Sequence, residues 1–177
     1  VEMLMETEAV KNADMIFAVG GGRVMDTCKV VRERLDKPMF TFPTLGSNCA
    51  ATTSIAVIYH PDGSVNNYFY GKIPAEHIFI NTKIIAESPE HMFWAGIGDA
   101  ISKELEAQLA IRGHKADHTP LMGNQLSLIC IDPLIEYGKK AYEDCKNNTE
   151  SFELEQVVLD IIITTGMVSN FMTTEND

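Results

Sequence analysis

Several features that mark out particular classes of protein are scarce or missing in this sequence of 177 residues. No run of roughly 18 apolar residues occurs, so we expect no membrane-spanning helix. Lys and Arg number 14 against 25 Asp and Glu, and they form no dense cluster. The net charge of −11 therefore argues against nucleic acid or an anionic membrane as the main partner.

The cysteines and the first residues of the sequence exclude two further classes. Only four cysteines occur, and no two of them form a C-x-x-C pair, which favours reduced thiols over a disulfide framework. The first residues are acidic and lack the basic segment of a secretory signal. We therefore expect a cytoplasmic protein.

The apolar pattern of the first half predicts strands that alternate with a helix. Residues 15–19 form a short apolar run followed by glycine, which predicts a buried strand. Residues 24–35 have helical spacing, with Val24 and Cys28 on the apolar face, and residues 39–42 form a second apolar strand. A strand, a helix and a strand within about 30 residues predict a βαβ unit and hence a parallel sheet.

A second kind of pairing follows in the chain. Residues 54–59 and 65–70 are rich in β-formers and flank the turn sequence Pro-Asp-Gly-Ser at 61–64, which predicts an antiparallel hairpin. Residues 78–81 predict one more short buried strand. These elements complete an α/β part of the chain.

From Ser88 onward the pattern becomes helical. The composition, with 45% apolar and 22% charged residues, is ordinary for a folded protein.

From the change to a helical pattern we predict an α/β domain over residues 1–86 and an all-α domain over residues 87–177. The helices expected in the second domain cover residues 91–112, 119–132, 133–146 and 152–170.

Three consecutive glycines, at 20–22, separate the first strand from the first long helix. Glycine lets the backbone approach a ligand closely, and the free N–H groups at a helix start suit a phosphate or pyrophosphate. Asp26 lies in the first turn of this helix. The alternative is a tight turn without a ligand, since the triplet is neither G-x-G-x-x-G nor a P-loop.

A polar loop at residues 43–53 follows the second strand and is rich in small hydroxyl side chains. Such side chains can bond a ribose or a nicotinamide amide, although an ordinary surface loop has the same composition. The loop and the glycine turn both leave the carboxyl ends of parallel strands, which is where α/β sheets bind ligands.

Asp99 lies between apolar residues within the first helix of the second domain, next to Gly96 and Gly98. Each glycine costs roughly 1 kcal/mol of helix stability relative to alanine, which is tolerated where something must approach the backbone. A lone carboxylate on a helix is usually solvated. If Asp99 instead points inward, it needs a cationic partner or a metal.

Three blocks of residues, in order, resemble the signatures of one family. Residues 19–29 (V-G-G-G-R-V-M-D-T-C-K) resemble the motif G-G-G-[SK]-x-x-D-x-x-K of the iron-containing alcohol dehydrogenase superfamily. Residues 42–44 (F-P-T) resemble the start of its next block, and residues 96–100 (G-I-G-D-A) with Glu106 resemble its G-[MI]-G-D-A…E-A helix. The glycerol dehydrogenase branch is the most similar.

The resemblance implies a fold and an activity. The fold would be a Rossmann-like, parallel-sheet nucleotide-binding domain followed by an all-α metal-binding domain, as in dehydroquinate synthase, with both domains incomplete. The activity would be oxidation of a small alcohol or polyol by hydride transfer to NAD or NADP, with zinc or iron as the metal. We also expect a homo-oligomer.

The resemblance also assigns roles to individual residues, while it identifies no catalytic residue. Asp99 would be a metal ligand, and the family's two metal-binding histidines would lie beyond Asp177. Cys49 stands where similar glycerol dehydrogenases carry a substrate-binding Asp, which argues against glycerol itself. The residues that would bind the cofactor are Gly21, Gly22, Arg23, Asp26, Thr44, Ser47, Thr53, Ile55, Tyr59 and Lys72.

Other functions on the same fold stay open. A 3-dehydroquinate synthase-like lyase would need several Lys, Arg and Asn residues near the metal, and few follow Asp99. A glycerol-1-phosphate dehydrogenase-like enzyme is a second alternative. A nucleotide-binding fragment without catalysis is a third, because one carboxylate does not hold a catalytic metal by itself.

Overall fold

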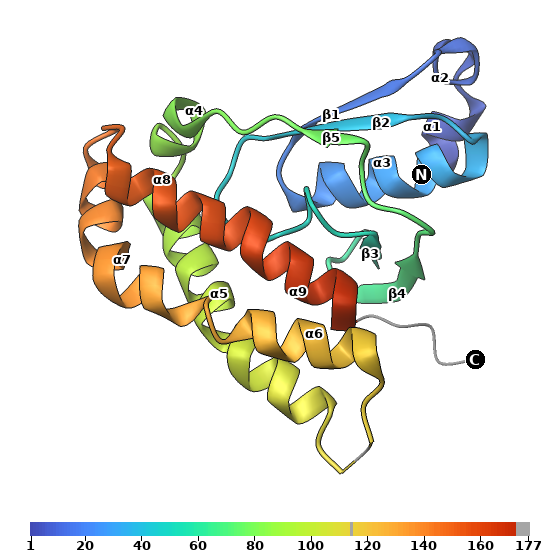
Figure 1. Cartoon of the computed structure of the whole chain (residues 1–177). Coiled ribbons are helices and arrows are strands. Elements are labelled where there is room, and N and C mark those ends of the chain that lie inside the picture. Colours follow the sequence, from blue (N-terminus) through green and yellow to red (C-terminus); the bar gives the residue numbers. More distant parts are fainter. Residues whose placement is uncertain (114, 173–177) are drawn as a thin grey trace. The chain divides into compact units, whose positions relative to one another are not determined.

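The computed structural model describes residues 1–113 and 115–172. The chain forms two compact units (Figure 1). The first comprises residues 1–43 and 50–80, and the second comprises residues 44–49 and the chain from Asn81 onward. The expected domains, 1–86 and 87–177, stay a prediction.

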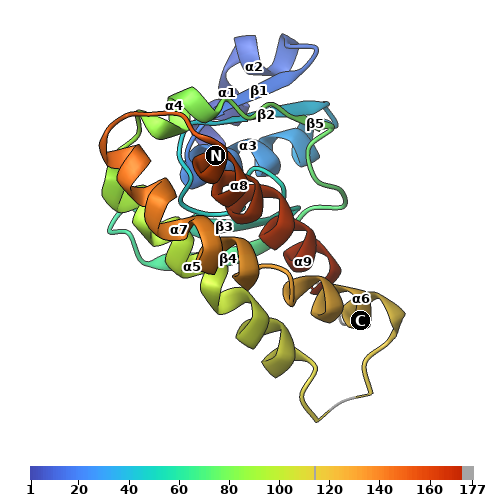
Figure 2. The same ribbon diagram turned by 60° about the vertical axis from the view of Figure 1, so that its left-hand side comes forward.

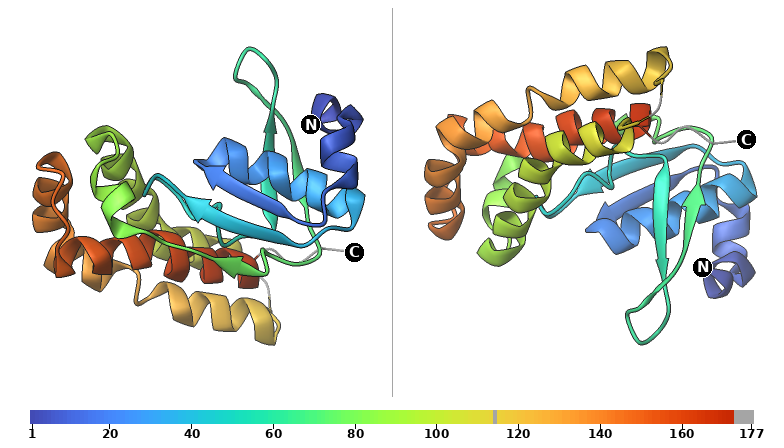
Figure 3. Two further views of the ribbon diagram at one scale, coloured as in Figure 1. Left: turned by 90° about the horizontal axis from the view of Figure 1, so that it is seen from above. Right: turned by 90° about the horizontal axis from the view of Figure 1, so that it is seen from below.

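The first unit contains the predicted βαβ unit and the predicted hairpin. Strands β1, β2 and β5 form a parallel sheet in the order β1-β2-β5, while β3 and β4 pair antiparallel. Figure 3 shows the hairpin extending away from the sheet, with its turn at the far end. The elements are α1 (Glu2–Glu6), α2 (Glu8–Asn12), β1 (Ile16–Gly20), α3 (Gly22–Leu35), β2 (Met39–Pro43), β3 (Ile55–Tyr59), β4 (Val65–Tyr70) and β5 (His77–Ile78).

The strands of the parallel sheet are buried on one face only. Ala18 and Thr41 are fully buried on the face that α3 covers. Phe17 and Val19 alternate with Ala18 and are each 58% exposed, because side chains of a strand alternate between faces. The strands predicted at 15–19 and 78–81 are present as β1 and the two-residue β5, but the prediction that they are buried was wrong, because most of their residues are exposed or half-buried.

Helix α3 buries only part of the predicted face: Val31 is buried, and Cys28 is half-buried. Val24 is exposed, whereas Asp26, Lys29 and Arg32 are buried. Charged side chains occupy the interior here because each has a partner. The Arg32 guanidinium, for example, donates to Glu76 Oε1 at 2.9 Å.

The second unit is helical apart from the loop of residues 44–49. Its predicted helices are confirmed with shifted ends, and a π-helical turn, Asp160–Thr164, interrupts the last of them. Helix α4 was not predicted. The elements are α4 (Thr82–Ala86), α5 (Glu90–Ala110), α6 (His118–Ser127), α7 (Ile131–Lys146), α8 (Phe152–Leu159) and α9 (Thr165–Met172) (Figure 2).

The loop of residues 44–49 lies directly against α5. A Cβ atom on Gly96 would lie 1.9 Å from the carbonyl oxygen of Gly46, and one on Gly46 would lie 2.9 Å from the ring of Phe93. The expected close approach to the backbone of α5 is therefore made by this loop. In the part of the chain that the structure describes, no helix is both long and apolar enough to cross a bilayer.

Candidate functional site

The glycine turn joins β1 to α3 at the edge where β1 and β2 both end, since Gly20 pairs with Pro43. Gly20 has a φ of +152°, and a Cβ there would lie 2.8 Å from Val24 Cγ2, so glycine is required. Gly21 is the N-cap of α3 and Gly22 its first residue, and no side chain caps the helix start. The first backbone N–H groups of α3 could therefore donate hydrogen bonds to a bound anion.

Two of the expected cofactor residues meet beside this turn. The Arg23 guanidinium lies 5.1 Å from the centre of the Tyr59 ring, a cation–π contact. Both residues line a surface cavity of about 330 Å³, together with Thr27 and His60. A positive charge and an aromatic ring therefore border one cavity at the start of α3.

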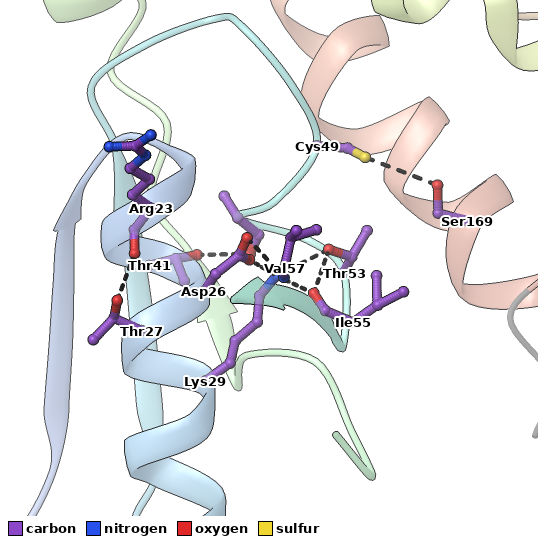
Figure 4. Close-up of polar contacts among 11 residues, drawn as sticks. Arg23, Asp26, Thr27, Lys29, Thr41, Cys49, Thr53, Ile55, Val57 and Ser169 are labelled. Carbon is purple, nitrogen blue, oxygen red and sulfur yellow. Dashed lines mark hydrogen bonds and ion pairs between the residues drawn. The ribbon is translucent and has the colours of Figure 1, made fainter. Parts of the chain in front are cut away.

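Asp26 is held by the interior of the first unit. Its Oδ1 accepts a hydrogen bond from Lys29 Nζ at 2.9 Å, and its Oδ2 accepts one from the Val57 N–H at 3.1 Å. Figure 4 shows both contacts. Asp26 thereby ties the first turns of α3 to strand β3.

Lys29 connects three of the residues expected at the site. Besides Asp26, its ammonium donates to Thr53 Oγ1 at 3.0 Å and to the carbonyl oxygen of Ile55 at 2.6 Å. The side chain is buried, so these bonds form away from water. Lys29 was not among the predicted site residues, although the D-x-x-K spacing places it one turn after Asp26 on the same helix face.

Lys72 stays accessible in the first unit. Its side chain is 88% exposed, and its ammonium lies 3.7 Å from Glu33 Oε1. Such an exposed pair is weak, because water screens it. Lys72 remains free to move toward a ligand.

The other expected residues belong to the second unit. Thr44, Ser47 and Cys49 are half-buried in the loop that crosses α5. Cys49 Sγ lies 3.8 Å from Ser169 Oγ on α9, as Figure 4 shows. The loop is thus fixed at one end by Gly46 and at the other by the Cys49 thiol.

Asp99 is half-buried on α5, as expected for an inward carboxylate. Burial raises its pKa above the ordinary value, while the nearby Lys103 ammonium opposes that shift. Lys103 itself pairs with Glu106 at 2.8 Å. Across residues 1–113 and 115–172, no three His, Cys, Asp or Glu side chains gather closely enough to hold a metal. Asp99 is one ligand at most, and these residues do not complete a metal site.

Comparison with known proteins identifies the family. A family profile described as iron-containing alcohol dehydrogenase matches residues 1–89. The chain belongs to the iron-containing alcohol dehydrogenase family. The prediction made from the glycine turn and the helix of Asp99 is thereby confirmed.

Two named relatives are similar to this chain over most of its length. A glycerol dehydrogenase of Thermotoga maritima is 29% identical over 152 residues, 84% of this chain and 42% of that protein. Glycerol dehydrogenase 1 of Schizosaccharomyces pombe is 32% identical over 148 residues, 80% of this chain and 33% of that protein. The chain thus spans less than half the length of these relatives.

A solved structure agrees with this assignment. The crystal structure of glycerol dehydrogenase from Schizosaccharomyces pombe is 28% identical, with a TM-score of 0.83 over 96% of this chain and 44% of that one. The predicted fold, a Rossmann-like α/β part followed by a helical part, is confirmed for this family member.

The second unit contains one buried acid that the sequence did not single out. Asp160 is 2% exposed, at the start of the π-helical turn. Neither of its carboxylate oxygens has a well-formed hydrogen bond to any described residue. Burial raises the pKa of Asp160 to about 7, although the Thr164 hydroxyl acts in the opposite direction.

The raised pKa makes stability depend on pH in a definite direction. Between the ordinary Asp pKa of 3.8 and about 7, the folded chain holds a proton that the unfolded chain has lost. The free energy of unfolding therefore falls as pH rises through this window, by about 2–4 kcal/mol. We expect Asp160→Asn to remove this fall, as measured by urea unfolding of both proteins at about pH 4, 5.5 and 7.5.

Asp144 provides the matched control. Burial acts to raise its pKa, but hydrogen bonds from Lys140 and Ser151, together with the Lys140 charge, outweigh burial and lower the pKa. Asp144→Asn should therefore destabilise the chain at neutral pH, with a loss that shrinks as pH falls below the ordinary Asp range. Equal pH slopes for Asp160→Asn and the parent chain would contradict the assignment of a protonated Asp160.

Proposed function

We propose that this chain is part of an oxidoreductase that transfers hydride between a small alcohol or polyol and NAD or NADP. The observation that carries the proposal is the uncapped start of α3 at the sheet edge, with Arg23 and Tyr59 beside it. Two of the relatives are named glycerol dehydrogenases, which supports the reaction class.

The residues of the first unit would bind the dinucleotide. The N–H groups of Gly21 and Gly22 would donate to the pyrophosphate, and Arg23 would neutralise part of its charge. Tyr59 lines the same cavity as Arg23. Asp26 would act by holding β3, and hence Thr53 and Ile55, in register with the helix start.

The remaining expected residues would contact the reacting end. Thr44 and Ser47 carry hydroxyl groups suited to a ribose or a carboxamide, and Lys72 would reach the cofactor from its exposed position. Cys49 would contact the substrate. Because a thiol is a weak hydrogen-bond acceptor, we propose an alcohol or polyol other than glycerol.

Asp99 would be one ligand of zinc or iron. A carboxylate suits either metal, but one ligand does not make a site, and we assign no catalytic step to a metal. The other ligands would come from residues beyond those described. The protein would act in the cytoplasm as a homo-oligomer.

Binding of NAD⁺ tests the proposal directly on this chain. We expect Arg23→Glu to weaken NAD⁺ binding about tenfold or more in isothermal titration calorimetry, because it replaces a positive charge beside the pyrophosphate with a negative one. Arg34→Glu is the matched control. Arg34 lies at the other end of α3, where it pairs with Glu2, and its reversal should leave the affinity unchanged.

Turnover tests the reaction class. We expect a chain that also contains the remaining metal ligands to form NADH from NAD⁺. The assay would use a panel of diols and secondary alcohols with added Zn²⁺ or Fe²⁺. Asp99→Ala should then abolish turnover and leave NAD⁺ binding intact. If the 177-residue chain bound neither NAD⁺ nor NADP⁺, the proposed function would be wrong.

A further inference from the structure

Lys103 is the one half-buried lysine or arginine among the described residues of the second unit. Its side chain is 12% exposed, whereas the other lysines and arginines described in this unit are exposed. Removing an ammonium from water is costly unless partners compensate. Glu106 Oε2 accepts a hydrogen bond from it at 2.8 Å, but the Glu106 side chain is 54% exposed, and such a pair could form at the surface. The burial of Lys103 therefore needs a second explanation.

Lys103 lies on the face of α5 against which the loop of residues 44–49 packs. Gly96 and Lys103 are seven residues apart, which places them about 20° apart around the helix and about 10 Å apart along it. The loop covers Gly96, since a Cβ there would lie 1.9 Å from the carbonyl oxygen of Gly46. The three residues from Gly46 to Cys49 can span about 10 Å, so the loop is long enough to bring Cys49 to the level of Lys103.

The groups that act on the Lys103 ammonium show what lies near it. Burial acts to lower the pKa of Lys103, but the hydrogen bond to Glu106 and the fields of Cys49 and Asp99 raise it above the ordinary value. Such fields weaken with distance and are screened by water and salt. The ammonium is therefore charged at neutral pH and lies within electrostatic reach of both Cys49 and Asp99.

The surroundings of this ammonium leave room for an anion. An ammonium has three N–H donors and Glu106 accepts one of them, so up to two remain for a ligand. Cys49, which we propose contacts the substrate, presents a thiol, and a thiol does not repel an anion as a carboxylate would. Glu106 accepts hydrogen bonds from Ser102 as well as Lys103, and Asp99 would be bound to the metal.

We propose that Lys103 binds a carboxylate of the substrate, so that the small alcohol this protein oxidises is a hydroxy acid. The inference rests on the proposed function and narrows it. Asp99 lies one turn before Lys103, about 6 Å along α5. A substrate whose hydroxyl lies toward Asp99 would therefore present a carboxylate on a neighbouring carbon to Lys103. That carboxylate would accept a charge-assisted hydrogen bond, which a neutral diol of the same size would not form.

Alkylation of Cys49 tests the charge on the 177-residue chain without turnover. Iodoacetate carries a carboxylate, and iodoacetamide is its neutral analogue. The ratio of their rates at Cys49, measured by peptide mass spectrometry, therefore reports attraction of a carboxylate, while changes in the exposure or nucleophilicity of the thiol affect both rates and cancel. Lys103→Met should lower this ratio at least about threefold, and Lys103→Arg should retain it.

Two controls make the alkylation result specific. Lys139→Met removes an exposed lysine of the same unit, on α7, and should leave the ratio at Cys49 unchanged. Cys28, in the first unit, is an internal reference whose ratio neither variant should alter. Circular dichroism would verify that each variant keeps its helices. An unchanged ratio at Cys49 in Lys103→Met, or an equal fall in Lys139→Met, would overturn the proposal.

Substrate preference tests the same inference in a chain that also contains the remaining metal ligands. Lactate and propane-1,2-diol differ in one group, a carboxylate in place of a hydroxymethyl, so the ratio of their kcat/KM values isolates the carboxylate. We expect lactate to be preferred, and Lys103→Met to lower the ratio at least about tenfold.

The outcomes separate this inference from the proposed function. A parent chain that preferred propane-1,2-diol, or its phosphate ester, would overturn the assignment of a hydroxy acid and leave hydride transfer standing. Failure of the 177-residue chain to bind NAD⁺ or NADP⁺ would instead overturn the proposed function itself, whatever the alkylation ratio at Cys49.

Discussion

Lys29→Met should lower the free energy of unfolding by about 3–5 kcal/mol, the range found when one partner of a buried ion pair is removed. The parent ammonium is buried and donates to Asp26, Thr53 and the Ile55 carbonyl. Methionine fills similar space but donates to none of them. The Asp26 carboxylate then stays buried, with the Val57 N–H as its remaining partner among the described residues.

Urea unfolding followed by circular dichroism would measure this loss, and two variants make it specific. Lys72→Met removes an exposed lysine and should change the free energy of unfolding by less than about 0.5 kcal/mol. The double variant Lys29→Met, Asp26→Leu removes both charges, and we expect it to recover part of the stability. A loss below about 1 kcal/mol for Lys29→Met would show that the Asp26–Lys29 pair does not hold β3 to α3.

The same variant tests whether Asp26 acts by positioning β3 or by contacting the cofactor directly. If Asp26 acts by positioning β3, Lys29→Met should impair NAD⁺ binding even though Lys29 is buried away from the cavity of Arg23 and Tyr59. Hydrogen exchange at the Val57 amide would report the loosening, since that N–H bonds Asp26. If Lys29→Met lowered stability but left the Val57 amide protected, the loss of stability would not come from loosening of β3.

Local spacing was sufficient to predict the βαβ unit and the glycine turn. A short apolar run, three glycines and a helical repeat are all decided by neighbouring residues. The buried face of α3 was only partly predictable in this way. Hydrophobic spacing favoured Val24, but the helix buries Asp26, Lys29 and Arg32, whose partners lie between 3 and 44 residues away along the sequence.

In the candidate site, too, some features follow from the local sequence and others only from the packing of the folded chain. The resemblance identified Asp26, Thr53 and Ile55 separately, and only the structure reveals Lys29 as their common partner. Asp160 was missed because one acid within an apolar helical run looks like a solvated position. Its burial comes from the packing of the whole second unit and from the π-helical turn that begins at this residue.

Gly96→Ala and Gly98→Ala should change stability in opposite directions, although the two residues are two positions apart on α5. A Cβ at Gly96 would lie 1.9 Å from the Gly46 carbonyl oxygen, and backbone cannot move aside as a side chain can. We expect Gly96→Ala to cost about 3 kcal/mol or more. A Cβ at Gly98 meets no described atom within 4 Å, so Gly98→Ala should gain about 0.5–1 kcal/mol from helix propensity.

Trp94, the one tryptophan of the chain, lies on the same helix, so its fluorescence reports unfolding of the second unit. Urea titrations followed by this fluorescence would measure both changes in the free energy of unfolding. Gly96→Ala should also free the loop of residues 44–49, so its Cys49 thiol should react faster with iodoacetamide than in the parent chain, while Gly98→Ala should leave that rate unchanged. If Gly96→Ala were as stable as Gly98→Ala, the loop would not be held against α5, and the glycine at position 96 would need another explanation.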